Sequence, residues 1–95
     1  MTISNTTENQ ERLNERLVIL IEECAEVQQM ASKILRFGIE SSWLNEANKD
    51  RLESELGDLL GMVDELCENG FLDRELIDQA SLKKREKIKL WMNHY

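Results

Sequence analysis

The absence of proline constrains this chain more than any other feature: none occurs in 95 residues, and only four glycines do. Proline interrupts a helix because it lacks a backbone N–H group and its ring clashes with the preceding turn. A chain without it can form long helices, and so few glycines argue against a sheet with many turns. We therefore predict an all-α fold, built as one domain over residues 1–95 with residues 1–7 frayed.

The first predicted helix is the longest. It starts at a cap formed by Thr6 or Thr7 and runs to Phe37, with Gly38 as its stop. Ile39–Asn45 follows as a connection, in which a short helical turn is one option. The helix presents a wide apolar stripe, which consists of Leu13, Leu17, Leu20, Cys24, Val27, Ala31 and Ile34.

Two further helices follow the same amphipathic pattern. The second is predicted from about Glu46 to Asn69, ending at Gly70, and the third begins after a cap at Asp73 and continues toward the C-terminus. Three helices with wide apolar stripes rarely cover one another in so short a chain. Because a second copy offers the missing cover, we expect a homodimer or homotetramer whose subunits together form a four-helix-bundle-like core.

Acidic residues stand at the edge of the apolar stripe in the first two helices. Glu23 and Glu55 project among apolar side chains at about 100° per residue, and Glu26 and Asp58 follow three residues later on nearly the same side. Because unpaired carboxylates are costly to bury and repel each other, we expect these four acids to converge on a cation. Carboxylate oxygens suit Mg²⁺, with Mn²⁺ as a substitute.

The acidic spacing has two alternative interpretations. In a chain with 19 acidic residues, such spacings also arise on solvated helix faces that hold no ion. A di-iron carboxylate bundle would need a Glu-x-x-His pattern on two helices. The single histidine, His94, cannot supply that pattern, and we expect it to be solvated.

Three lysines are candidates for contact with an anionic substrate. Lys84 falls within the apolar stripe of the third predicted helix, and Lys87 lies about 60° to one side. Lys33 lies on the same side of the first helix as Glu26. Snorkelling is the alternative for Lys84, and an ion pair is the alternative for Lys33. Trp43, in the connection, can either stack on a nucleobase or fill a dimer contact.

The overall composition limits which binding partners and which cellular location we expect. A net charge of −7 argues against binding a nucleic acid polymer through its phosphates. No apolar run reaches the roughly 18 residues of a transmembrane helix, and Met1 to Asn14 is polar, so we expect a cytoplasmic protein without a membrane partner. Cys24 and Cys67 project toward apolar stripes and are expected to be reduced core thiols.

The acidic motifs also resemble the signature of a known family. Glu22-Glu23-x-x-Glu26 followed by Glu55-x-x-Asp58 is similar to the motif of the MazG-like, all-α nucleoside triphosphate pyrophosphohydrolases, which include the dimeric dUTPases. The likeness covers roughly Asn14 to Lys89 and looks like the single-domain versions found in bacteria and their phages. It implies a dimer or tetramer that hydrolyses a nucleoside triphosphate to the monophosphate and pyrophosphate with Mg²⁺.

The resemblance assigns roles to individual residues. It implies that four acids bind the metal, namely Glu23, Glu26, Glu55 and Asp58. Glu22 would then be an auxiliary catalytic acid that orients water or holds a further ion, and basic residues such as Lys84, Lys87 and Lys33 would bind the substrate phosphates. Some relatives carry paired acids at the second motif, whereas Ser54 precedes Glu55 here, so the number of metal ions stays open.

A non-enzymatic function is the main alternative. An acidic helical oligomer with the same residues could act as a nucleotide sensor or as a protein-interaction module. For an oligomer whose carboxylates are merely surface features, Mg²⁺ is expected to leave the melting temperature unchanged, because only a ligand of the folded state stabilises it.

Overall fold

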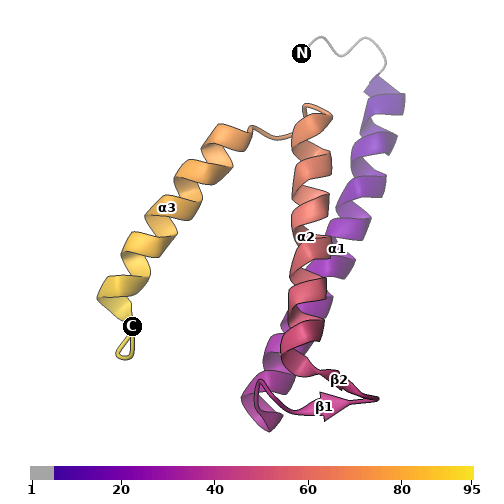
Figure 1. The fold of residues 1–95 in the computed structure, drawn as a ribbon. Helices are drawn as coiled ribbons and strands as arrows, with labels where there is room; N and C mark the ends of the chain where they lie inside the picture. The colour runs from indigo at the N-terminus through magenta and orange to yellow at the C-terminus, as the bar shows by residue number, and fades with distance from the viewer. Residues whose placement is uncertain (1–5) are drawn as a thin grey trace.

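The computed structural model describes residues 6–95, with side chains from residue 7 onward. It contains three helices and one very short hairpin (Figure 1). In chain order, the elements are α1 (Thr6–Phe37), β1 (Ser42–Trp43), β2 (Glu46–Ala47), α2 (Asn48–Glu68) and α3 (Arg74–Trp91). The all-α prediction is confirmed. α1 begins at Thr6, where the sequence predicted the start of the first helix. Residues 1–5, part of the segment 1–7 predicted to be frayed, lie outside the described part of the chain.

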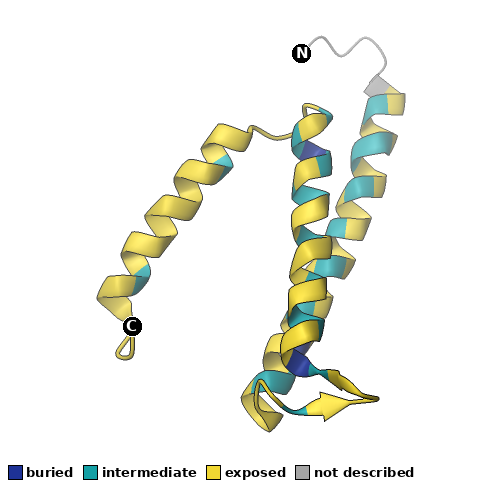
Figure 2. Ribbon diagram, in the orientation of Figure 1, coloured by how far each residue is buried: buried dark blue, intermediate teal, exposed yellow. Residues whose placement is uncertain are grey.

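Helices α1 and α2 pack side by side as an antiparallel pair, which we call the α1–α2 pair (Figure 1). Its interior is thin, and most of both helices is intermediate or exposed (Figure 2). Among residues 7–95, Met30 and Leu66 are the only buried apolar side chains, at 2% and 0% exposure. Leu17 and Cys24, on the predicted apolar stripe of α1, are exposed. Helix α2 therefore covers only part of that stripe. Most apolar surface of the single chain is therefore open to solvent.

The connection between α1 and α2 is a hairpin with a two-residue loop, not a helical turn. Ser42 pairs with Ala47 and Trp43 with Glu46. The loop residues Leu44 and Asn45 have φ angles of 53° and 65°, as a type I′ turn requires. Since the second strand occupies residues 46–47, α2 starts two residues later than predicted.

The start of α2 is tied to the connection that follows α1 by three hydrogen bonds. Asn48, only 4% exposed, donates its side-chain Nδ2 to the carbonyl of Gly38 at 3.1 Å. The backbone N–H of Asn48 donates to the carbonyl of Ser41 at 2.8 Å, and that of Lys49 to the carbonyl of Ile39 at 3.0 Å. The hairpin is thus fixed against both helix ends.

The turn between α2 and α3 follows the predicted signals. Gly70 has a φ of 77°, and the N–H of Phe71 donates to the carbonyl of Leu66 at 2.9 Å, which closes the helix end. The carboxylate of Asp73 then accepts a hydrogen bond from the N–H of Glu75 at 2.9 Å, as an N-cap does. Both predicted boundaries are confirmed.

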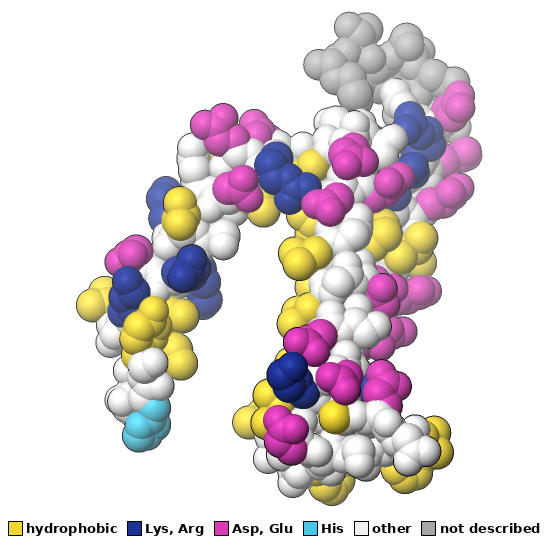
Figure 3. All heavy atoms as spheres, in the orientation of Figure 1, with side chains coloured by type: hydrophobic (Ala, Val, Ile, Leu, Met, Phe, Trp, Pro, Cys, Tyr) yellow, Lys and Arg dark blue, Asp and Glu magenta, His cyan; other side chains and the backbone are white. Residues whose placement is uncertain are grey.

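Helix α3 diverges from the α1–α2 pair (Figure 1). All of its residues are exposed except Ile77 and Ile88, which are half-buried. Its start is held by an ion pair between Arg74 and Asp64 of α2. Basic side chains are spread along α3, whereas acidic side chains dominate the visible face of the α1–α2 pair (Figure 3).

Two smaller expectations have clear outcomes. Both cysteines are free thiols, but Cys24 is exposed and Cys67 is half-buried, so the placement of Cys24 in the core was wrong. The reason is that α2 covers only part of the apolar stripe of α1. No helix within residues 6–95 is long and apolar enough to cross a membrane.

Candidate metal centre

Four acidic side chains from two helices meet on one side of the α1–α2 pair. Glu23 and Glu26 come from α1, and Glu55 and Asp58 come from α2. One carboxylate oxygen from each of the four lies within 4.8 Å of the others. The three-residue spacing on each helix turns both acids toward the partner helix, and the antiparallel packing brings the two spacings opposite each other. The predicted convergence of these acids is confirmed.

The four acids, which we call the acidic cluster, are only partly sheltered. Glu23 and Glu55 are half-buried, whereas Glu26 and Asp58 are exposed. The Oε2 atoms of Glu23 and Glu55 are buried and have no hydrogen-bond partner within the described part of the chain. A buried acceptor without a donor is unfavourable. A divalent cation with oxygen ligands would satisfy both atoms, so the residues present fit Mg²⁺ or Mn²⁺.

The electrostatics of the cluster favour added positive charge. A hydrogen bond with the Glu26 carboxyl group, followed by desolvation and the negative charges of Glu26, Asp58 and Glu23, raises the pKa of Glu55 to about 7. The pKa of Glu23 is also raised, first by desolvation and then by its acidic neighbours, which include Glu22. Without a cation, the cluster therefore holds a proton up to near-neutral pH.

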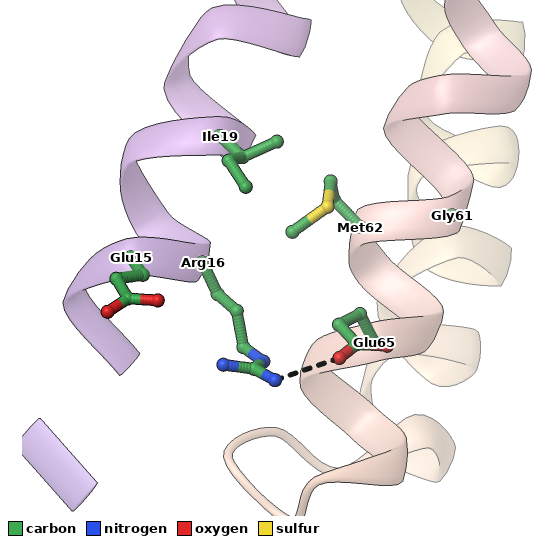
Figure 4. A pocket seen from close by; sticks show the side chains of 6 residues that line it. All are labelled: Glu15, Arg16, Ile19, Gly61, Met62 and Glu65. Carbon is green, nitrogen blue, oxygen red and sulfur yellow. Dashed lines mark hydrogen bonds and ion pairs between the residues drawn. The ribbon is translucent and has the colours of Figure 1, made fainter. Parts of the chain in front are cut away.

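A first hollow, of about 340 Å³, lies toward the N-terminal end of α1 (Figure 4). Its walls include Ile19 of α1 and Met62 of α2. The guanidinium of Arg16 is paired with the Glu65 carboxylate at 3.0 Å, the dashed line in Figure 4. Sequence reasoning missed Arg16 and Glu65. The available signal was their spacing of seven residues from Glu23 and Asp58, which puts them two turns away on the same side.

A second hollow, of about 290 Å³, lies at the opposite end, between α1 and the hairpin. We call it the hairpin pocket, and it is lined by Lys33, Phe37, Ser41, Ser42, Trp43 and Asn48. It thus contains two residues that the sequence had singled out for substrate contact, Lys33 and Trp43. The two hollows flank the acidic cluster along the helix pair.

The remaining candidate residues lie at the surface. Glu22 is exposed beside the cluster. Lys84 and Lys87 are exposed on α3, and neither forms an ion pair with any residue among 7–95. The Nζ atom of Lys84 instead lies 5.8 Å from the centre of the Trp91 ring. His94 is exposed beyond the end of α3, as expected.

Comparisons with known proteins add no assignment. No protein-family model, no curated protein and no solved structure matches this chain. The protein is therefore described by its fold and site: a small three-helix chain with an acidic cluster that can hold a metal ion.

Proposed function

We propose that the protein is a Mg²⁺-dependent nucleoside triphosphate pyrophosphohydrolase of the MazG-like type, with Mn²⁺ as a substitute metal. The observation that carries the proposal is the convergence of Glu23, Glu26, Glu55 and Asp58 within 4.8 Å, with unpaired buried oxygens on two of them. Carboxylate oxygens are ligands that Mg²⁺ accepts together with substrate phosphates and water, and four acids from two helices can supply them here.

The proposed reaction breaks the bond between the α- and β-phosphates. A water oxygen attacks the α-phosphorus, and pyrophosphate departs with the bridging oxygen. The cluster would hold Mg²⁺, which when bound neutralises phosphate charge and lowers the pKa of water. Glu22, exposed beside the cluster, accepts the proton of the attacking water. Lys84 and Lys87 stabilise the negative charge of the departing pyrophosphate.

The lysines of α3 reach the cluster, in this proposal, through a second copy of the chain. α3 carries six basic and three acidic residues, a net charge of +3. α1 and α2 together carry six basic and thirteen acidic residues, a net charge of −7. Apolar residues are exposed on both surfaces, with Leu76 and Trp91 on α3 at 62% and 72% and Ile21 and Leu60 on the pair at 67% and 60%. Complementary charge and shared apolar surface support a homodimer or homotetramer.

The test is a pyrophosphate-release assay with Mg²⁺ and a panel of ribo- and deoxyribonucleoside triphosphates. Glu55→Gln and Asp58→Asn are expected to reduce turnover by at least about a hundredfold while the protein stays helical. Glu53→Gln is the matched control, because Glu53 lies on the same helix but pairs with Lys49 and is not in the cluster. Full turnover in the Glu55 or Asp58 variant, or release of orthophosphate instead, would contradict the proposal.

One observation favours a second candidate function. Because Glu26 and Asp58 are exposed, the cluster also suits a non-catalytic role as a nucleotide sensor or a protein-interaction module. A sensor is expected to gain stability from Mg²⁺ and nucleotide together but to release no pyrophosphate. A pure interaction module is expected to show no change in melting temperature with Mg²⁺.

A further inference from the structure

The hairpin pocket lies on the same side of the helix pair as the acidic cluster. Lys33 follows Glu26 by seven residues on α1, and Asn48 precedes Glu55 by seven residues on α2. Seven residues are almost two full turns and span about 10 Å, so both positions face the way the cluster does. A ligand extended along the helix pair can therefore contact the cluster and the pocket together.

The lining of the hairpin pocket suits an aromatic, polar ligand. Trp43 exposes 64% of its surface and offers its ring for stacking. Phe37 is 59% exposed, but the guanidinium carbon of Arg36 lies 4.8 Å from the centre of its ring. The side chains of Ser41 and Ser42 have no hydrogen-bond partner, and Lys33 no ion-pair partner, among the described residues. Nucleobases stack on aromatic side chains regardless of sequence, while hydroxyl groups supply hydrogen bonds to base or sugar.

The pocket is built on a fixed backbone. The bonds from Asn48 and Lys49 to the end of α1 hold the hairpin in place. Leu44, beside Trp43, has a positive φ of 53° although it is not glycine. Such a conformation is unfavourable and persists where the surrounding structure holds it, which often happens at binding sites.

The other hollow is less suited to a base. Its guanidinium, on Arg16, is already paired with Glu65, and Glu15 adds a further negative charge. It contains no aromatic ring. The hairpin pocket, at about 290 Å³, is near the lower limit of small-molecule sites, a size that suits a base with its sugar.

We propose that the hairpin pocket binds the nucleoside part of a nucleotide, with the base stacked on Trp43 and the phosphates directed past Lys33 to the acidic cluster. This inference rests on the proposed function for the identity of the ligand. It adds the place and the residues that hold the base, and it can be tested without metal or turnover.

The direct test uses Trp43 fluorescence. The chain has two tryptophans, so Trp91→Phe leaves Trp43 as the only reporter. Adenosine, guanosine, cytidine, uridine and thymidine are titrated in the absence of metal. We expect saturable quenching by at least one nucleoside and none by inorganic tripolyphosphate. In the same background, Ser42→Ala should weaken the binding of that nucleoside about tenfold, because one hydrogen bond to it is lost.

A kinetic test separates the pocket from the metal centre. Trp43→Ala should raise KM for the best nucleoside triphosphate about tenfold to a hundredfold, the usual effect of removing one stacking ring. Trp43→Phe should restore most of the affinity. Leu35→Ala, at an apolar position that is 88% exposed and outside the pocket, is the control.

The outcomes keep the two proposals apart. If no nucleoside quenches Trp43 while Glu55-dependent pyrophosphate release persists, the pocket assignment is wrong and the proposed function stands. If nucleosides quench Trp43 but no nucleoside triphosphate is hydrolysed, the pocket assignment is supported and the proposed enzymatic function is wrong. If a second copy covers Trp43, its fluorescence will respond to protein concentration and not to nucleosides, which also overturns the pocket.

Discussion

Glu26 of α1 and Glu55 of α2 bring carboxylate oxygens within 4.8 Å of each other, and the interaction with Glu26 is the largest cause of the raised pKa of Glu55. Two carboxylates this close repel each other unless one of them carries a proton or a cation lies between them. In the metal-free protein, a proton on Glu55 reduces that repulsion. A bound cation would take the place of that proton.

The stability of the metal-free protein should fall as pH rises toward neutral. Glu55 has a pKa of about 7 when folded, against an ordinary value of 4.5, so folding favours its protonated form. That contribution is fully present below about pH 4.5 and is lost as pH rises through about 7. Melting temperatures measured with a chelator between pH 5 and 8 should show the decline, and Glu55→Gln should flatten it. A melting temperature that rises over this window would contradict the protonation of Glu55 in the folded protein.

Mg²⁺ binding should strengthen over the same window. The ion must displace the proton on Glu55, so its apparent affinity should increase about tenfold between pH 6 and pH 8 for a group with a pKa near 7. Calorimetric titrations in two buffers of different ionisation enthalpy should detect proton release at pH 6.5 and almost none at pH 8.5. Equal proton release at both values would mean that another group titrates.

The thin interior of the α1–α2 pair makes its few buried side chains important. Leu66 is fully buried, so Leu66→Ala should lower the free energy of unfolding by about 2 to 5 kcal/mol. Leu35, at 88% exposure, is the matched control, and Leu35→Ala should change it by less than about 0.5 kcal/mol. Urea denaturation of both variants measures the difference. If the two substitutions lowered the free energy of unfolding by similar amounts, the burial of Leu66 would not explain its contribution to stability.

Helix ends and the acidic cluster could be predicted because their signals are local. Gly38, Gly70 and Asp73 act through their own backbone or side chain, and the three-residue acid spacing fixes the direction of each carboxylate within one helix. A helical wheel cannot show how much of a stripe the neighbouring helix covers. For that reason the core position expected for Cys24 was wrong.

The hairpin was missed because its turn residues give a misleading signal. Type I′ turns favour Asn and Gly, yet the first loop residue here is Leu44, with a φ of 53°. The hairpin is closed by strand pairing and by hydrogen bonds at its base, which join residues up to ten apart in the sequence, such as Asn48 and Gly38. The hairpin pocket depends on those contacts, so its shape could not be read from local patterns.

Asn48 should be important for keeping the hairpin in place. Asn48→Asp removes the side-chain donor to the Gly38 carbonyl and places a negative charge beside it, so it should lower the free energy of unfolding by about 1 to 3 kcal/mol. Lys49→Ala, which removes an exposed ion pair with Glu53, should cost less than about 0.5 kcal/mol. Chemical denaturation compares the two. If Asn48→Asp were as mild as the control, the hydrogen bond to Gly38 would not hold the hairpin.

Charge on α3 should control assembly if this helix docks on the α1–α2 pair of a second copy. Replacing Lys84 and Lys87 by Glu changes the net charge of α3 from +3 to −1, so it should repel the acidic pair and give monomers in sedimentation experiments. Replacing Lys49 and Arg51 by Glu changes the total charge by the same amount, but on α2, and should leave the oligomer intact. The comparison separates local charge complementarity from general repulsion.

Added salt should weaken the wild-type oligomer only in part. Exposed apolar residues such as Leu76 contribute hydrophobic stabilisation, which salt does not screen. A wild-type chain that stays monomeric at all concentrations would remove the docking proposal, and Lys84 and Lys87 would then have no route to the acidic cluster through a partner.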